Sequence, residues 1–166
     1  MASLVYLVSS IPALSFGQEP PISMEAFLDD ARRELSSNQF QSLEKLDLQQ
    51  ISEIKVSGKL RQFIKSIGEL NTDIAEIRNA REQGRSPGLT TLTSVFMDKN
   101  PLEREKHLMR WQWDELTNIE ADQHFTLTQV LVYKLKLQIL YRLHSFDQQK
   151  GEEVLNSIID PSKRKE

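Results

Sequence analysis

The sequence predicts an all-α protein, a single-domain bundle of five to seven helices spanning residues 1–166, and three observations support this prediction. Apolar residues recur at helical spacing over long stretches, whereas no run alternates as a strand would. Six glycines and six prolines are few for this length and cluster at a handful of places, which favours long elements. The chain has no cysteine, and a domain of this size can bury roughly 70% of its unfolded surface without a disulfide.

The apolar run from Leu4 to Val8 predicts a buried first element, helix or strand, that anchors the N-terminus to the core. A secretory signal is disfavoured because no Lys or Arg precedes this short run and Pro12 follows it closely. A membrane-spanning helix would need about 20 apolar residues, and no stretch here provides them. We therefore expect a cytoplasmic protein without a membrane span.

Pro20-Pro21 predicts an extended connection, and Ser23 is typical of an N-cap. A helix is expected from Met24 to about Leu35, ending at the polar residues 36–38. Its expected inner side comprises Phe27, Leu28, Ala31 and Leu35. Residues 39–56 are consistent with one or two short helices whose bounds the sequence leaves open.

The most regular pattern predicts an amphipathic helix from about Lys59 to Gln83. Its apolar positions follow a 4, 3, 4, 3 spacing at Phe63, Ile67, Leu70, Ile74 and Ile77, widened by Leu60 and Ile64. Two heptads are too few for a coiled coil, so packing inside a bundle is favoured. Residues 84–88 are a candidate internal linker, and residues 89–97 fit a strand, a short helix or a packed loop.

Asn100-Pro101 predicts the start of a helix that continues to about Ala121. A second helix, from about Phe125 to Phe146, is apolar around most of its circumference, so we expect it to be interior to the domain or to have one side covered by a partner. Gly151 is expected to separate a final short segment, residues 152–159, and residues 161–166 are expected to form a flexible tail.

No motif in the sequence indicates catalysis, a cofactor or a metal. A phosphate-binding loop and a nucleophile elbow are not recognisable. The three histidines, His107, His124 and His144, lack the spacing of zinc ligands. The carboxylates have basic neighbours at helical spacing, as on solvated faces, and a net charge of −3 argues against nucleic acid. A non-enzymatic protein is favoured, and an enzyme with a diffuse helical pocket is the weaker reading.

The run Arg110-Trp111-Gln112-Trp113 is more specific. Two residues lie about 200° apart on a helix, so Trp111 and Trp113 cannot share one face. We expect one indole to pack inside and the other to lie at a margin as an interface anchor, unless neighbouring helices cover both. Arg110 is expected to cap carbonyl groups or to pair with Glu103 or Asp114.

Several segments carry a resemblance to known proteins. They are Tyr6–Phe16, Pro20–Ser23 followed by Phe27, Asn100–Glu105, Arg110-Trp111, Phe125–Leu127 and Tyr133–Leu140. Together they resemble a small bacterial family associated with V/A-type ATPase operons. More distantly, the chain resembles the C-type component of the rotary ATPase, called d in eukaryotic V-ATPases. That component is all-helical and non-catalytic, and it seats the central stalk on the proteolipid ring.

The resemblance implies a non-catalytic interaction subunit, accessory protein or assembly factor of a V/A-type ATPase. The implied partners are the central stalk or the proteolipid ring, which would place the protein at the inner membrane through the complex. The C-type component contains about three related helical units, and a chain of this length holds one or two by the usual size of domains. The residues implied to bind a partner or to carry the family motif are Asn100, Pro101, Glu103, Arg110, Trp111, Trp113 and Tyr133. The alternative is a helical adaptor or regulator, unrelated to ATPases, that pairs through the 59–83 helix.

Overall fold

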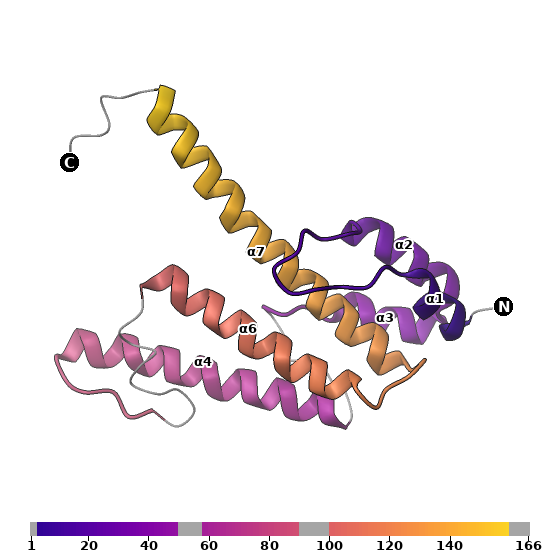
Figure 1. The fold of residues 1–166 in the computed structure, drawn as a ribbon. Helices are drawn as coiled ribbons and strands as arrows, with labels where there is room; N and C mark the ends of the chain where they lie inside the picture. Colours follow the sequence, from indigo (N-terminus) through magenta and orange to yellow (C-terminus); the bar gives the residue numbers. More distant parts are fainter. Residues whose placement is uncertain (1–2, 50–57, 90–99, 160–166) are drawn as a thin grey trace.

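A computed structural model describes residues 3–49, 58–89 and 100–159. Within these ranges the chain forms six α-helices and no strand, which confirms the all-α prediction (Figure 1). The helices are α1 (Leu4–Ser10), α2 (Met24–Glu34), α3 (Ser37–Lys45), α4 (Lys59–Gln83), α6 (Pro101–Glu120) and α7 (Leu127–Ile159). The open predictions for residues 50–56 and 90–97, and the predicted tail at 161–166, lie outside the described residues.

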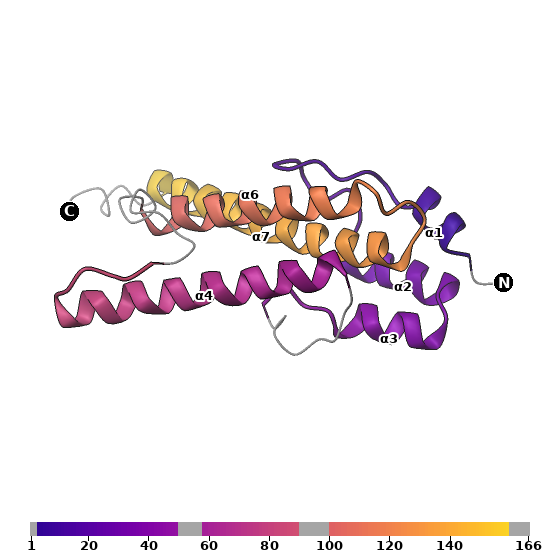
Figure 2. The same ribbon diagram turned by 90° about the horizontal axis from the view of Figure 1, so that it is seen from below.

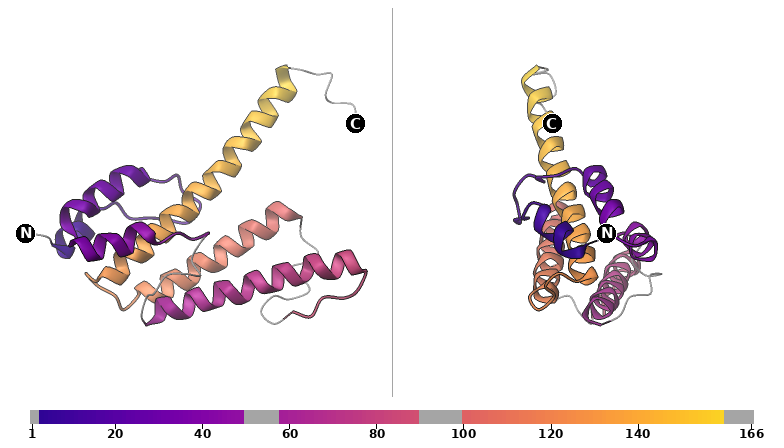
Figure 3. Two further views of the ribbon diagram at one scale, coloured as in Figure 1. Left: turned by 180° about the vertical axis from the view of Figure 1, so that it is seen from behind. Right: turned by 90° about the vertical axis from the view of Figure 1, so that its right-hand side faces the viewer.

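Helix α7 is the element on which both halves of the fold pack. Helix α6 runs antiparallel to α7 and contacts it along one side, and α4 packs on α6 (Figure 2). The first three helices, α1, α2 and α3, all contact the N-terminal part of α7 from the other side. The C-terminal part of α7 then leaves the other helices and projects away from them, as both views of Figure 3 show.

The helix starts follow the predicted caps. The Ser23 hydroxyl accepts a hydrogen bond from the Ala26 N–H at 3.1 Å, and the Asn100 side chain accepts one from the Glu103 N–H at 2.8 Å. Each bond satisfies a backbone donor that has no partner inside its helix. Helix α4 has the predicted bounds, and Gly84 ends it in the left-handed conformation with φ 66°.

The polar residues expected to end α2 also begin α3. Ser36 is the N-cap of α3, where its hydroxyl accepts from the Gln39 N–H and the Gln39 side chain accepts from the Ser36 N–H. Helix α2 ends at Glu34 and α3 begins at Ser37, so only the two cap residues, Leu35 and Ser36, lie between them. The reciprocal capping box allows α3 to start this soon after α2. The prediction for this region failed to place α3 because a polar cluster signals a cap without showing how closely a second helix follows it.

The predicted N-terminal anchor is the short helix α1, which contacts the core with one side. In α1, Leu7 is fully buried in the core, whereas Val5 and Tyr6 are 55% and 64% exposed. The apolar run at the start of the chain therefore folds as a helix that presents one side to the core.

The middle of α7 confirms the prediction of an interior helix. From Val130 to Leu140 every side chain is buried except Gln138, which is half-buried. The core around it draws on all six helices, with the largest fully buried side chains at Leu7, Phe27, Leu43, Leu60, Leu116 and Leu135. Burial on this scale supplies the main stabilising free energy of the fold.

The polar residues of this buried stretch each have a defined partner. The Lys134 ammonium group is 5% exposed and donates to the carbonyl oxygens of Leu43 (2.8 Å), Glu44 (3.1 Å) and Leu46. These carbonyls belong to the last turn of α3 and to its C-cap residue Leu46, and the Leu43 carbonyl also accepts from the Leu46 N–H at 3.3 Å. The lysine therefore acts as a C-cap from another element. Burial lowers the pKa of Lys134 below its ordinary value.

Lys136 and Gln138 make similar connections. Lys136 forms an ion pair with Glu120, the last residue of α6. The Gln138 side chain accepts a hydrogen bond at 3.0 Å from the backbone N–H of Leu48, in the segment after α3. The apolar helix predicted from the sequence is thus tied to α3, to α6 and to the segment after α3 by its few polar side chains.

The predicted break at Gly151 is wrong. Helix α7 runs without interruption from Leu127 to Ile159 and includes the segment expected to be separate. Glycine inside a helix costs only about 1 kcal/mol relative to alanine, and no proline follows until Pro161. One glycine is therefore too weak a signal to end a helix this long.

The candidate linker at 84–88 folds back against α4. Arg85 forms an ion pair with Glu76, and the Gly88 N–H donates to the same carboxylate at 3.3 Å. The hydrogen bond from Arg85 lowers the pKa of Glu76 below its ordinary value. These contacts make the segment a turn attached to the end of α4.

Among the helices in the described ranges, none is both long enough and apolar enough to cross a membrane.

Replacing Lys134 tests whether its ammonium group holds α3 in place. Lys134→Met keeps the apolar stem but removes the ammonium donor from three carbonyl groups at the C-terminal end of α3, and we expect it to lower the free energy of unfolding by about 1–3 kcal/mol. Urea denaturation monitored by circular dichroism measures the change. Lys45→Met, at an exposed lysine of α3, is the matched control and should change stability little. Equal effects of the two substitutions would contradict the capping role.

Candidate functional site

The connection between α1 and α2, residues 11–23, crosses α7 and is called here the N-terminal strap (Figure 1). Two tyrosines of α7 hold it. The Tyr133 hydroxyl donates to the Pro12 carbonyl at 2.7 Å, and the Tyr141 hydroxyl donates to the Ile22 carbonyl at 2.8 Å. The strap is therefore fixed at both ends by residues more than a hundred positions away in the sequence.

Between these two points the strap brings Phe16 against α6. The Phe16 and Trp113 ring centroids are 5.5 Å apart with the rings edge to face at 66°, and the Arg110 guanidinium lies 4.8 Å from the Phe16 centroid. On α7, the Lys136 ammonium lies 4.8 Å from the Trp113 centroid and pairs with Glu120. We call Phe16, Arg110, Trp113, Lys136 and Glu120 the cation–aromatic cluster. Its contacts combine edge-to-face and cation–π attraction.

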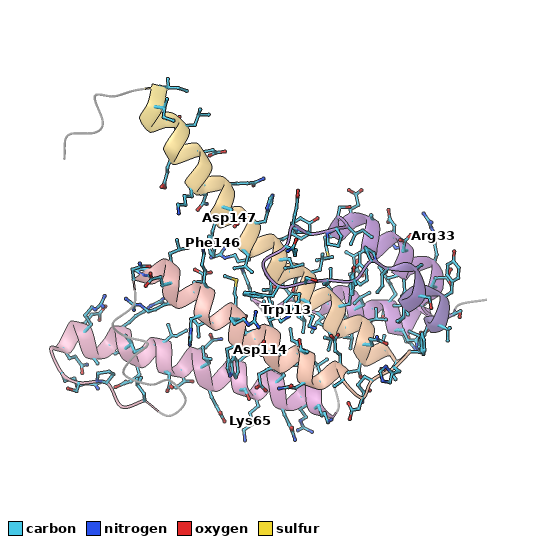
Figure 4. The ribbon with its side chains drawn as sticks, in the orientation of Figure 1. Arg33, Lys65, Trp113, Asp114, Phe146 and Asp147 are labelled. Atoms are coloured by element: carbon cyan, nitrogen blue, oxygen red, sulfur yellow. The ribbon has the colours of Figure 1, made fainter. Side chains whose placement is uncertain are left out.

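The two tryptophans differ in burial as the helical geometry predicts. Trp113 is 7% exposed and lies between α6 and α7 (Figure 4). Trp111 is half-buried and packs against the margin of the core. One indole is thus internal, and the other keeps part of its surface open to solvent.

Arg110 lies at the exposed end of the cluster. Its guanidinium contacts the Asp114 carboxylate at 3.3 Å, one helical turn away, which is one of the pairings expected from the sequence. Both partners are more than half exposed, so the ion pair itself adds little stability. Arg110 and Trp111 are consecutive on α6, and both keep part of their side chain open to solvent.

The other predicted site residues on α6 lie elsewhere. Asn100 and Pro101 form the start of α6, and Glu103 supplies the backbone N–H that Asn100 caps. Twelve helical residues separate Pro101 from Trp113, about 18 Å along the axis. The structure therefore does not bring Asn100, Pro101 and Glu103 to the cation–aromatic cluster, and it gives Asn100 and Pro101 a clear structural role.

Tyr133 joins the site from α7. Its ring packs on Phe27 with centroids 5.0 Å apart, and its hydroxyl holds the strap at Pro12. Burial raises the pKa of Tyr133 to about 12. This residue positions the strap, and through the strap Phe16, rather than presenting itself to a partner.

Sequence reasoning from the residues themselves missed Phe16, Lys136 and Glu120 as members of the site. Phe16 lies in one of the segments that carry the resemblance, but its position in a loop gives no periodicity from which its neighbours could be inferred. Lys136 and Glu120 read as ordinary polar positions at helix surfaces. Only the crossing of α6 and α7 shows that they meet.

The candidate metal ligands lie on three separate elements: His107 on α6, His124 in the turn before α7 and His144 on α7. Across residues 3–49, 58–89 and 100–159, no three His, Asp or Glu side chains gather closely enough to hold a metal ion.

Tryptophan fluorescence tests the assignment of the two indoles. Each tryptophan is studied alone, in Trp111→Phe and in Trp113→Phe. Because Trp113 is the buried indole, acrylamide should quench the Trp111→Phe protein less than the Trp113→Phe protein. Circular dichroism shows that both variants remain folded. Quenching constants in the opposite order would contradict the packing described here.

Alkaline titration tests the environment of Tyr133. Because its pKa is raised from 10.0 to about 12, the native protein holds a proton there that the unfolded chain loses first. The stabilisation is complete below pH 10 and disappears as the pH rises towards 12. Ultraviolet difference spectra should show a tyrosinate step near pH 12 that Tyr133→Phe removes, and stability should fall less steeply with pH in that variant. An unchanged last step in Tyr133→Phe would exclude this assignment.

A known family matches the chain over more than half of its length. No curated protein and no solved structure matches the chain significantly. A family model described as "Protein of unknown function (DUF2764)" matches residues 55–165. The match includes α4, α6 and α7, with Arg110, Trp113 and Tyr133, and leaves α1 to α3 and the strap outside it. Because the matched residues make up most of the sequence, the chain belongs to the DUF2764 family.

Proposed function

We propose that this protein is a non-catalytic interaction subunit, accessory protein or assembly factor of a V/A-type rotary ATPase. The observation that most supports this proposal is that segments carrying the resemblance contact one another in the folded protein. The Tyr6–Phe16 segment contacts the Arg110-Trp111 region through Phe16, and it contacts the Tyr133–Leu140 segment through Pro12. Segments far apart in the sequence thus converge where Arg110 and Trp111 reach the surface.

In this role the protein acts by docking. Arg110 and the open part of Trp111 would form the centre of a contact, since arginine and tryptophan often supply most of the free energy of binding at protein interfaces. The surrounding charges, including Asp114, would form its polar rim. ATP hydrolysis and ion transport would belong to the partner proteins of the central stalk or the proteolipid ring, and the protein would lie in the cytoplasm beside the inner membrane.

The alternative, an adaptor that pairs through the 59–83 helix, has less support. The apolar stripe of α4 is already used inside the chain, where Leu60, Phe63 and Ile67 are buried in the common core. Pairing with a foreign helix through the same stripe would require these side chains to leave α6.

Affinity purification from native membranes tests the proposal. The tagged protein is isolated in mild detergent, and co-eluting proteins are identified and quantified by mass spectrometry. We expect catalytic and stalk subunits of the ATPase in a fixed ratio to the tagged protein. Arg110→Ala/Trp111→Ala should reduce their recovery at least about tenfold, as expected for the loss of two central contact residues.

The matched control is Arg33→Ala, which removes an exposed arginine of α2 paired with Asp30 and distant from the cluster (Figure 4). It should leave recovery unchanged. Thermal unfolding of each variant separates loss of binding from loss of fold. Recovery of the protein alone, or only with unrelated soluble proteins, would refute the proposal.

A further inference from the structure

A cleft of about 1110 Å³ opens between α4, α6 and α7, and we call it the three-helix cleft. Its apolar lining includes Ile74 of α4 and Leu108 of α6, which are both half-buried. Tyr141 and Arg142 line it from α7, at the end of the buried part of that helix. A helix about 10 Å across occupies a comparable volume over two to three turns.

One edge of this cleft carries positive charge that no ion pair with another described residue neutralises. Arg78 and Arg81 of α4 line the cleft and are exposed, and neither side chain makes an ion pair or hydrogen bond with another described residue. Three carboxylates also line the cleft: Asp47, Glu82 and Glu105. Glu105 is paired with Arg142 at 2.7 Å. An acidic partner would therefore gain the most electrostatic attraction at Arg78 and Arg81 on α4.

The end of α7 has the complementary character. Leu155, Ile158 and Ile159 are 55%, 62% and 71% exposed and form an apolar patch over the last two turns of the described helix. Glu152 lies one turn before Leu155 on the same face, with Glu153 beside it. Both carboxylates are exposed and form no ion pair with other residues in the described ranges. We call residues 152–159 the α7 end.

We propose that two copies of this chain form a symmetric dimer in which the α7 end of each copy occupies the three-helix cleft of the other. The apolar patch would pack on Ile74 and Leu108, and the two glutamates would face Arg78 and Arg81. Lys150, which precedes the α7 end, would approach Glu82. The apolar patch of one copy would cover the apolar lining of the other, and the opposite charges of the two surfaces would pair.

The occupant is a second copy because the two surfaces cannot meet within one chain. Helix α7 is continuous through Gly151, and its C-terminal part is directed away from the cleft that its middle lines (Figure 3). In a symmetric dimer both α7 ends and both clefts are covered, so no further copy can join through these surfaces, as is usual for twofold interfaces.

Charge reversal tests the pairing. Sedimentation velocity of the full chain, over a wide range of concentrations, should show a monomer–dimer equilibrium. Glu152→Lys/Glu153→Lys and Arg78→Glu/Arg81→Glu should each raise the dissociation constant at least about tenfold. The two pairs of changes combined in one chain should restore the dimer. Arg61→Glu/Lys65→Glu, on the exposed side of α4 outside the cleft, is the matched control and should leave dimerisation unchanged.

Cross-linking locates the contact, because the chain has no cysteine of its own. Copies with Ile74→Cys and differently tagged copies with Ile158→Cys are mixed and treated with a short bismaleimide. We expect a cross-link between the two tags that is absent when Val5→Cys, at an exposed position of α1, replaces Ile158→Cys.

A monomer at all concentrations would overturn the proposal and leave the cleft to a different protein. A dimer that is insensitive to both charge reversals, or that does not cross-link Ile74→Cys to Ile158→Cys, would also overturn it. These measurements use the purified protein alone, so their outcome does not depend on whether an ATPase is the partner.

Discussion

The Lys134 ammonium group, buried in the middle of α7 and bonded to three carbonyls of α3, is the interaction on which the arrangement of helices depends. A buried charge is tolerated only when its hydrogen-bonding capacity is used, and here three donors meet three acceptors. The bonds fix α3 relative to α7, while Lys136 and Gln138 fix the end of α6 and the segment after α3. Apolar burial alone would allow these helices to slide, because it has no direction. The polar side chains of an otherwise apolar helix therefore determine where its neighbours lie.

Local signals in the sequence were sufficient to place three of the six described helices, α2, α4 and α6. Ser23 and Asn100-Pro101 mark helix starts because their side chains or ring geometry satisfy backbone needs at those positions, and the regular stripe of α4 gives its bounds. The prediction at Gly151 failed because a local preference of about 1 kcal/mol was treated as decisive. The direct succession of α2 and α3 was missed because the cap residues of the two helices, Leu35 and Ser36, are neighbours in the sequence.

The part of the candidate site predicted from the sequence comprises Arg110, Trp111 and Trp113 of α6 and Tyr133 of α7. Helical geometry separates Trp111 from Trp113 without knowledge of the fold, and the structure shows which of them is internal. The contact of Arg110 with Phe16 and that of Lys136 with Trp113 could not be inferred from the residues alone. Both depend on how the strap crosses α7 and on how α6 meets α7, and such tertiary contacts leave no trace in the spacing of a single sequence. Asn100 and Pro101 differ from these contacts, since the role that the structure shows for them, the start of α6, could be predicted from the local sequence.

The position of α7 also governs the order in which the chain can fold during synthesis. Its contacts with Pro12, Ile22 and Leu43 join residues 121, 119 and 91 positions apart, and α7 is the last described helix to leave the ribosome. Until it emerges, Phe27 and Leu43 lack part of the surface on which they pack, because α1, α2 and α3 each contact α7 as well as one another. Contacts of such long range slow folding and leave apolar side chains exposed in the nascent chain. The N-terminal third of the protein is therefore made first but completes its packing only when α7 is available.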